Sequence, residues 1–292
     1  MTLPKALPFT PVIIIGAARS GTNALRDALT ELPGFETWPC DEINPIWRHG
    51  NLRHPDDELP AGAARPEVCR YVRRSFERIW RRCGRPAFVV EKTCANSLRV
   101  PFVDAILPEA VFLYIVRDGV DVVASARKRW LGELEVPGLS YFLAKARFAP
   151  PGDLPVYATA ALSRRIAVSL GRRKHLGVWG PRFADMDRYY DAPVEELCAR
   201  QWAACVGRAD AALSNLSRSR VISVRYEDLA DNPSGTLNRI LERLGTDLPS
   251  DMVTAAAGKI HGASVGKGRN YIENLQEIMP ILEVPLMRHG YS

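Results

Sequence analysis

An arginine, two hydroxyl residues and two glycines stand close together near the start of the chain. Arg19, Ser20 and Thr22 lie within Gly16–Thr22, which separates a short β-branched run from a helical pattern. A glycine-containing loop between a strand and a helix directs backbone N–H groups and the positive end of the helix dipole at one anion. The hydroxyls add donors, and the arginine fork matches phosphate or sulfate oxygens. The segment therefore predicts a phosphate or sulfate site, with an ordinary strand-to-helix turn as the alternative.

The kind of anion loop follows from its spacing. Gly16 and Gly21 have the spacing found in nucleoside triphosphatases, but Thr22 stands where that loop has lysine. The dinucleotide fingerprint G-x-G-x-x-G is absent from this segment. The loop therefore fits neither pattern, and a kinase with a degenerate loop remains an alternative.

A second set of reactive side chains combines two carboxylates with a lysine. Asp41 and Glu42 lie between two prolines and close in sequence to Trp38 and Trp47. Apolar rings beside a carboxylate disfavour its charged form and suit it to act as a general base. Lys92 follows a short apolar run, where a cation is able to neutralise charge on a transferring group. A solvated acidic loop and a surface ion pair are the simpler alternatives.

Two further segments carry residues that bind anions. Arg117 follows the strongest apolar run of the chain, and Ser125 lies about two helical turns after Gly119, so both are able to face a second phosphate. The basic, glycine-containing segment 262–269 is able to fold over an anion. Two anion loops in one chain suit a ligand with phosphates at two ends better than a mononucleotide.

An α/β framework is needed to hold these residues. Short β-branched runs predict buried strands, and the segments between them have helical spacing. Polar residues that follow parallel strands meet at one edge of an open sheet. The predicted strands are Val12–Ile15, Phe88–Val90, Val111–Val116 and Val221–Tyr226, and the predicted helices are Leu25–Leu32, Pro66–Trp80, Ser97–Leu107, Gly119–Trp130, Pro193–Leu216, Pro233–Leu244 and Ile272–Met287. One face of Pro66–Trp80 is basic and is predicted to be solvated, with Arg70, Arg73, Arg74 and Arg78.

The stretch 131–193 differs from the rest of the chain. It is rich in proline, glycine, aromatic residues and basic clusters. We expect a single domain over residues 1–292, in which 131–193 is an insertion that caps the active site and binds the acceptor. A shallow contact with a membrane surface is the alternative for this stretch.

Composition restricts the partners and the compartment. The chain has 292 residues and a formal net charge of +6, which suits an anionic ligand. No nucleic-acid-binding motif accompanies the charge, so nucleic acid is not an expected partner. No apolar run approaches the roughly 20 residues that cross a bilayer, and the first ten residues lack a signal-peptide core, which predicts a cytoplasmic protein. The six cysteines show no spacing typical of a metal site, so no metal is expected.

With these residues collected, the chain resembles the sulfotransferases that use 3′-phosphoadenosine 5′-phosphosulfate (PAPS). Four blocks match in order: Gly16–Asn23, Val116–Ser125 (V-R-D-G-x-D-V-V-x-S), Val224–Pro233 and Ser264–Arg269. The pattern is most similar to that of tyrosylprotein sulfotransferases and related bacterial sulfotransferases. The resemblance implies a three-layer, P-loop-like α/β fold, with a central parallel sheet flanked by helices and a helical cap.

The resemblance also implies roles, position by position. Binding of the 5′-phosphosulfate is implied for Arg19, Ser20, Gly21, Thr22, Asn23 and Ala24, and binding of the 3′-phosphate for Arg117 and Ser125. Tyr226 is expected near the adenine, and Ser264 and Lys267 are expected to close over the nucleotide. Glu42 is the implied general base, with Asp41 as the alternative, while Lys92 and Arg19 stabilise the bridging oxygen.

Three positions depart from the pattern of the family. Asn23 replaces the second threonine of the first loop, Val120 replaces a common arginine, and Gly268 replaces a common tryptophan. The first change exchanges a hydroxyl ligand for an amide, and the third removes a ring that stacks on the nucleotide.

The predicted reaction moves the sulfuryl group from PAPS to a hydroxyl of a carbohydrate or glycolipid and leaves 3′-phosphoadenosine 5′-phosphate (PAP). A protein tyrosine is the nearest rival acceptor. Outside this class, the alternatives are a kinase that needs Mg·ATP and a nucleotide-binding module without catalysis.

Overall fold

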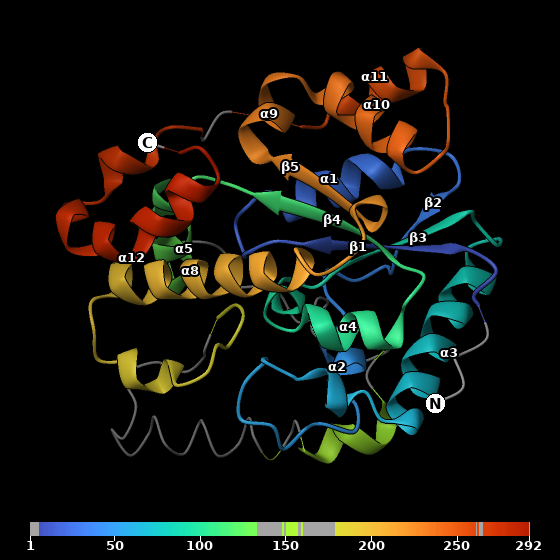
Figure 1. Cartoon of the computed structure of the whole chain (residues 1–292), viewed down its shortest axis with the longest axis horizontal. Helices are drawn as coiled ribbons and strands as arrows, with labels where there is room; N and C mark the ends of the chain where they lie inside the picture. Colours follow the sequence, from blue (N-terminus) through green and yellow to red (C-terminus); the bar gives the residue numbers. More distant parts are fainter. Residues whose placement is uncertain are drawn as a thin grey trace.

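Five parallel strands form the centre of the molecule in this computed structural model, which describes residues 6–132, 148, 150–156, 159, 179–260, 262 and 265–291. The strands run in the order β2-β3-β1-β4-β5 (Figure 1). They are β1 (Thr10–Ile15), β2 (Phe35–Glu36), β3 (Phe88–Lys92), β4 (Val111–Val116) and β5 (Val221–Arg225). Most of the predicted cap, 131–193, and Ser264 lie outside the described residues.

The register of the sheet follows from its β-branched residues. In β1, Val12 pairs with Val90 of β3 on one side and with Val111 of β4 on the other. β-Branched side chains pack well on a pleated surface, and a parallel sheet buries both of its faces. This is why the predicted strands 12–15, 88–90 and 111–116 read as continuous apolar runs. The edge strand β5 alternates instead and leaves Ser223 exposed, and all four predicted strands are confirmed.

Helices cover both faces of the sheet, which confirms the three-layer α/β prediction (Figure 1). The upper face in that view packs against α1 (Thr22–Thr30), α9 (Tyr226–Asp231), α10 (Pro233–Arg243) and α11 (Ser250–Ala257). The other face packs against α2 (Asn44–Trp47), α3 (Pro66–Arg82), α4 (Val100–Ile106), α5 (Gly119–Trp130), α8 (Val194–Leu213) and α12 (Leu275–Arg288). No helix within the described residues is long and apolar enough to cross a membrane.

Among the element boundaries that differ from the prediction are those of β3, of the segment 97–107 and of β5. The strand β3 continues to Lys92, so Glu91 and Lys92 lie in the sheet. The predicted helix 97–107 is a 3-10 turn, Cys94–Leu98, followed by α4, because Pro101 suits the first turn of a new helix. Tyr226 begins α9 and does not end the strand.

The basic face predicted for α3 is partly wrong. Arg70, Arg74 and Arg78 are exposed, but Arg73 is buried. The guanidinium of Arg73 donates to the carbonyl of Ile106 at 2.9 Å and contacts the Glu109 carboxylate at 2.6 Å. Burial of an arginine requires such partners, so Arg73 ties α3 to the end of α4.

We predict that Arg73→Ala lowers the free energy of unfolding by about 2–4 kcal/mol, because it removes one partner of a largely buried charge pair. The neighbouring exposed Arg74 provides the matched control, and Arg74→Ala is expected to change stability by about 0.5 kcal/mol or less. Urea unfolding of both variants measures the difference. Equal stability of the two variants would contradict a structural role for the Arg73 contacts.

Candidate functional site

The first predicted loop lies between β1 and α1, at the carboxyl edge of the sheet. Its backbone is left-handed at Arg19 (φ 74°) and at Gly21 (φ 87°). A Cβ atom on Gly21 would lie only 2.1 Å from the ring of Tyr226. Glycine is therefore required at position 21 for both the backbone angle and the close approach of the ring. This packing holds the first turn of α1, with its N–H groups, against the start of α9.

The hydroxyl of Ser20 is the clearest sign of an anion site in this loop. Ser20 is 1 % exposed, and its Oγ has no hydrogen-bond partner among the described residues. A buried hydroxyl without a partner costs free energy, so such a group calls for an explanation. An oxyanion held by the loop would accept this hydrogen bond. The residues present therefore fit a phosphate or sulfate group.

Positive charge converges on the same loop. Burial lowers the pKa of Arg19, and the nearby charges of Arg129 and Arg117 lower it further. Arg19 Nε donates to Ser125 Oγ at 2.9 Å, and the guanidinium of Arg117 stacks over the ring of Tyr226 at 4.6 Å. Like charges this close repel one another, and an anion between them would relieve the repulsion.

A pocket of about 250 Å³ opens beside Arg117 and Ser125. Its lining residues are Arg117, Asp121, Ala124, Ser125, Lys128, Lys267, Gly268 and Tyr271. Lys128 and Tyr271 were not among the predicted site residues; the ammonium of Lys128 lies 4.4 Å from the centre of the Tyr271 ring. The spacing of Lys128 was a usable signal, because residues three apart share a helix face and Lys128 follows Ser125 by three.

Asp121 fastens the C-terminal loop to this pocket. Its carboxylate accepts hydrogen bonds from the backbone N–H groups of Gly266 (2.8 Å) and Gly268 (2.6 Å), and it pairs with Arg117 at 3.1 Å. A Cβ atom on Gly268 would lie 2.6 Å from the Cα of Asp121. The departure at Gly268 therefore has a physical reason, because no side chain fits there. Lys267 is exposed and lines the pocket beside this contact.

The acidic pair and the lysine meet, as their assigned roles require. Lys92 Nζ lies 2.8 Å from Asp41 Oδ1 and 3.2 Å from Glu42 Oε1, and its side chain is 2 % exposed. Burial would lower the pKa of Lys92, but the charges of Glu42, Cys94 and Asp41 raise it above its usual value. Lys92 is therefore a fixed cation beside both carboxylates.

The two carboxylates differ in their surroundings. Burial alone would raise the pKa of Asp41, but the charge and hydrogen bond of Lys92, together with Arg26 at 2.9 Å, lower it to about 2. This contradicts the expectation that apolar rings disfavour the charged form of this carboxyl group. The rings of Trp38 and Trp47 instead pack on Phe76 in the core. The sequence did not predict the contact of Arg26 with Asp41, because nothing in the helical pattern around Arg26 indicates which distant residue it contacts.

A short contact joins the first loop to the acidic pair. Thr22 Oγ1 lies 3.7 Å from Cys94 Sγ, and the backbone N–H of Cys94 donates to Glu42 Oε1 at 3.3 Å. Asn23 is exposed and Ala24 is half-buried in the first turn of α1. The structure thus brings the first loop, the acidic pair and Lys92 together, and it links Arg19 to Ser125.

Beside Lys92 in β3 lies a buried carboxyl group, Glu91, that was not among the predicted site residues. Glu91 is 1 % exposed. Burial raises its pKa to about 7, although a hydrogen bond from Thr93 acts in the opposite direction. Strand alternation explains the placement, because neighbours in a strand point to opposite faces and only one of the two faces the acidic pair.

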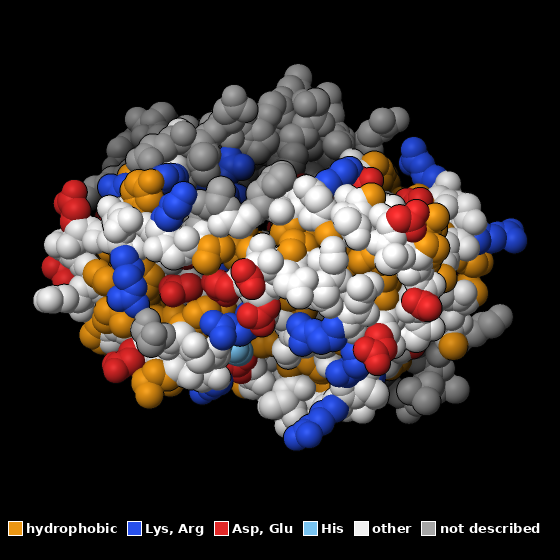
Figure 2. All heavy atoms as spheres, turned by 90° about the horizontal axis from the view of Figure 1, so that it is seen from above, with side chains coloured by type: hydrophobic (Ala, Val, Ile, Leu, Met, Phe, Trp, Pro, Cys, Tyr) orange, Lys and Arg blue, Asp and Glu red, His pale blue; other side chains and the backbone are white. Residues whose placement is uncertain are grey.

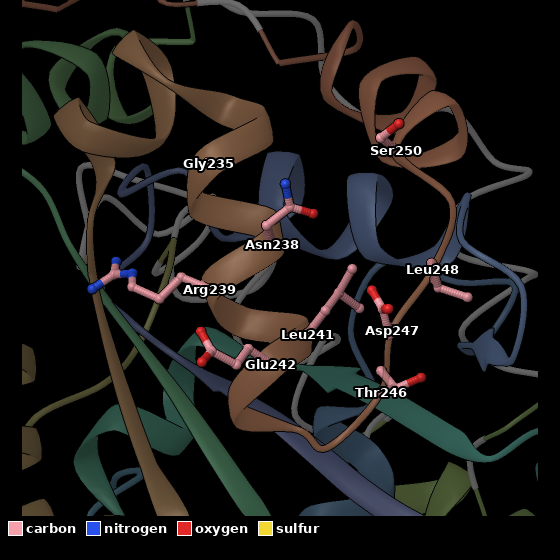
Figure 3. A pocket seen from close by; sticks show the side chains of 9 residues that line it. All are labelled: Gly235, Asn238, Arg239, Leu241, Glu242, Thr246, Asp247, Leu248 and Ser250. Carbon is pink, nitrogen blue, oxygen red and sulfur yellow. The ribbon is translucent and has the colours of Figure 1, made fainter.

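A larger pocket, of about 590 Å³, lies between α10 and α11 and away from these loops (Figure 3). Its lining combines Arg239 with the carboxylates Glu242 and Asp247, and Arg239 extends away from Asp247. The face seen in Figure 2 likewise intersperses acidic and basic side chains. Positive charge therefore does not gather in this pocket or into a single patch on that face. Among the described residues, no three His, Cys, Asp or Glu side chains are grouped as a metal site.

Comparison with known proteins identifies the family. A model described as "Sulfotransferase family" matches residues 11–147 and 171–250. Two solved structures are similar over almost the whole chain. The sulfotransferase domain from the curacin biosynthetic pathway has a TM-score of 0.61 and 13 % identity, covering 99 % of both chains. Mouse sulfotransferase SULT7A1, solved in complex with PAP, has a TM-score of 0.50 and 14 % identity, covering 98 % of this chain and 90 % of its own.

A third solved structure, sulfotransferase STF9 from Mycobacterium avium, has a TM-score of 0.57 and 12 % identity, covering 98 % of this chain and 78 % of its own. A search of curated protein sequences finds no match. At such low identity the solved structures show a shared fold, whereas the family model matches well over half of the chain. This chain belongs to the sulfotransferase family.

Proposed function

We propose that the chain transfers a sulfuryl group from PAPS to a hydroxyl group of an acceptor. The observation that carries this proposal is the link between two cationic sites, the 2.9 Å hydrogen bond from Arg19 to Ser125. One site is the loop with the unpartnered Ser20 hydroxyl, and the other is the pocket beside Arg117. PAPS carries an anionic group at each end of one nucleoside, so it matches two linked sites.

The residues divide between the two ends of this nucleotide. The loop Arg19–Ala24 would hold the 5′-phosphosulfate, and Arg117 and Ser125 would hold the 3′-phosphate. Lys267 and Ser264 would cover the nucleotide, and the adjoining Gly266 and Gly268 are anchored to Asp121. Tyr226 contacts the loop at Gly21 and the guanidinium of Arg117, and its expected position near the adenine stays a prediction.

The chemistry assigned to this chain is proton removal and charge stabilisation. PAPS supplies the sulfuryl group as a co-substrate. Glu42 takes the proton of the acceptor hydroxyl, whose oxygen then bonds to sulfur as the sulfur–oxygen bond to the 5′-phosphate breaks. Lys92 and Arg19 stabilise the negative charge that this bond cleavage leaves on the phosphate oxygen. Positioning and electrostatics suffice for such a transfer by analogy with phosphoryl transfer.

Glu42 is the better candidate for the base. Asp41 has a pKa of about 2 and contacts both Lys92 and Arg26, so it binds a proton weakly. Glu42 shares Lys92 at the longer distance of 3.2 Å. Asp41 then has a supporting role, because its carboxylate holds the buried ammonium of Lys92 beside the base.

The acceptor we propose is a carbohydrate or glycolipid hydroxyl, with protein tyrosine as the rival. This choice rests on the aromatic and basic character of 131–193, which we propose to be the acceptor-binding cap of a single domain. Arg127 at the end of α5 pairs with Glu195 at the start of α8, so the two ends of this stretch are held together. Peripheral contact with a membrane surface would suit a glycolipid acceptor.

Nucleotide titration tests the co-substrate. We expect PAP to bind about 10- to 100-fold more tightly than 5′-AMP, because only PAP has a 3′-phosphate to accept hydrogen bonds from a cation. Arg117→Ala should abolish this ratio, whereas the exposed Arg208, which pairs with Glu58 on the surface, should not affect it in Arg208→Ala. Isothermal calorimetry gives the affinities. Binding that requires Mg·ATP and ignores the 3′-phosphate would favour the kinase alternative.

Variants of the acidic pair test the base. We expect Glu42→Gln to lower kcat by about 10²- to 10⁴-fold, the typical contribution of a positioned general base. Asp41→Asn should cost about tenfold or less, because it weakens only the electrostatic support of Lys92. Transfer of radiolabelled sulfate from PAPS to 4-nitrophenol and to octyl glucoside measures both variants, with PAP affinity as the folding control. Equal losses of kcat in the two variants would contradict the assignment of Glu42, and not Asp41, as the base.

A further inference from the structure

A chain of buried hydrogen bonds connects Glu91 to the residue that follows the acidic pair. One carboxylate oxygen of Glu91 accepts from Thr93 Oγ1 at 2.5 Å, and the other accepts from Asn96 Nδ2 at 2.9 Å. Thr93 Oγ1 in turn accepts from the backbone N–H of Ile43 at 3.2 Å. Thr93 and Asn96 are fully buried. The backbone next to Glu42 is therefore tied to the interior of the sheet.

A second branch reaches Asn44, the first residue of α2, which directly follows Ile43. Asn96 Oδ1 accepts from Arg99 Nε at 2.8 Å, and Arg99 donates to Asn44 Oδ1 at 2.6 Å. Arg99 is completely buried, and Asp57 lies 3.6 Å from its guanidinium. Because Asn96 uses its amide nitrogen for Glu91 and its oxygen for Arg99, the orientation of the amide is fixed. Both branches start at the same carboxylate.

The acidic pair is thus held from both faces of β3. Lys92 contacts Asp41 and Glu42 directly, while Glu91, its neighbour in the strand, reaches the loop from the opposite face through Thr93 and Asn96. Within the described residues, Glu42 Oε1 contacts the ammonium of Lys92 and accepts from the backbone N–H of Cys94. Both contacts fall on one carboxylate oxygen, so the backbone that carries Glu42 sets where the rest of the carboxylate is directed. A general base must lie within hydrogen-bond reach of the proton that it removes.

We propose that Glu91 and Thr93 are positioning residues that orient Glu42 toward the acceptor hydroxyl, an inference that rests on the proposed function. Neither residue touches the reacting atoms. The direction of each hydrogen bond is what matters. Thr93 Oγ1 accepts from the backbone N–H of Ile43 and donates to Glu91. The ionised carboxylate of Glu91 accepts one hydrogen bond on each oxygen, whereas an amide at this position has a single acceptor oxygen.

Thr93→Val tests the proposal, because valine keeps the shape of threonine and lacks its hydroxyl. We expect the backbone amide of Ile43 to exchange with solvent about fivefold faster or more, since it loses its acceptor. We also expect kcat with 4-nitrophenol or octyl glucoside to fall by about 10- to 100-fold, because the base is displaced. KM for PAPS and the affinity for PAP should stay within about twofold, because the nucleotide loops keep their contacts.

Two variants serve as controls. Thr93→Ser restores the hydroxyl and should recover both the slow exchange of Ile43 and most of kcat. Thr236 also has a buried hydroxyl, which donates to the carbonyl of Asp228 away from the acidic pair. Thr236→Val should leave Ile43 exchange and kcat near those of the unaltered protein, and so reports the general effect of removing a buried hydroxyl.

The outcomes separate this inference from the proposed function. Faster exchange with a lower kcat and unchanged PAP affinity, rescued by serine, supports positioning. Unchanged exchange at Ile43, unchanged kcat, or an equal loss of PAP affinity in Thr93→Val overturns it. If the unaltered protein binds PAP but transfers no sulfate to either acceptor, the proposed function fails, and accelerated exchange would then make the network a purely structural anchor.

Discussion

The site depends on holding several cations close together. Carboxylates of the chain make this possible: Asp121 pairs with Arg117, and Asp41 shares its charge between Lys92 and Arg26. Each carboxylate also holds a particular segment in place, and Asp121 reaches two backbone amides of the C-terminal loop. The same contacts therefore neutralise the cations and fix the loops in place. A substitution that removes one of these carboxylates leaves a cation without its partner and also releases a loop.

The loops around the sheet act as one unit because short contacts join them in pairs. Arg19 reaches Ser125 from the first loop to α5, and Thr22 touches Cys94 beyond β3. Parallel strands bring these segments to a common edge, although they are far apart in sequence. The sheet brings these segments close together, and the hydrogen bond from Arg19 to Ser125 sets the spacing between the two cationic sites.

Much of this arrangement was predictable from sequence. The strands β1, β3 and β4 each lead into polar residues, as predicted, because continuous apolar runs mark a buried sheet and the polar residues that follow them mark its edge. What sequence could not give is the direction of a single side chain. Arg73 belongs to a basic stripe and yet points into the protein, since its partner Glu109 follows a separate helix. The sequence pattern indicates only that Gly268 stands where the family commonly has tryptophan. In the structure the backbone of Gly268 lies against Asp121, where no side chain fits. Such contacts depend on distant segments, and local patterns do not record them.

The attachment of the C-terminal loop to Asp121 has a consequence for the order in which the site forms during synthesis. The backbone N–H of Gly268 donates to the side-chain carboxylate of Asp121, so synthesis must pass residue 268 before this C-terminal wall of the pocket exists. A chain that has not yet reached Gly266 already contains β1, β4 and the segments that carry Arg19 and Arg117. It still lacks the C-terminal loop that binds to Asp121. Domains fold largely as units as they leave the ribosome. Nucleotide binding would then arise late, and a chain truncated before Gly266 would keep most of the sheet but lose this wall of its site.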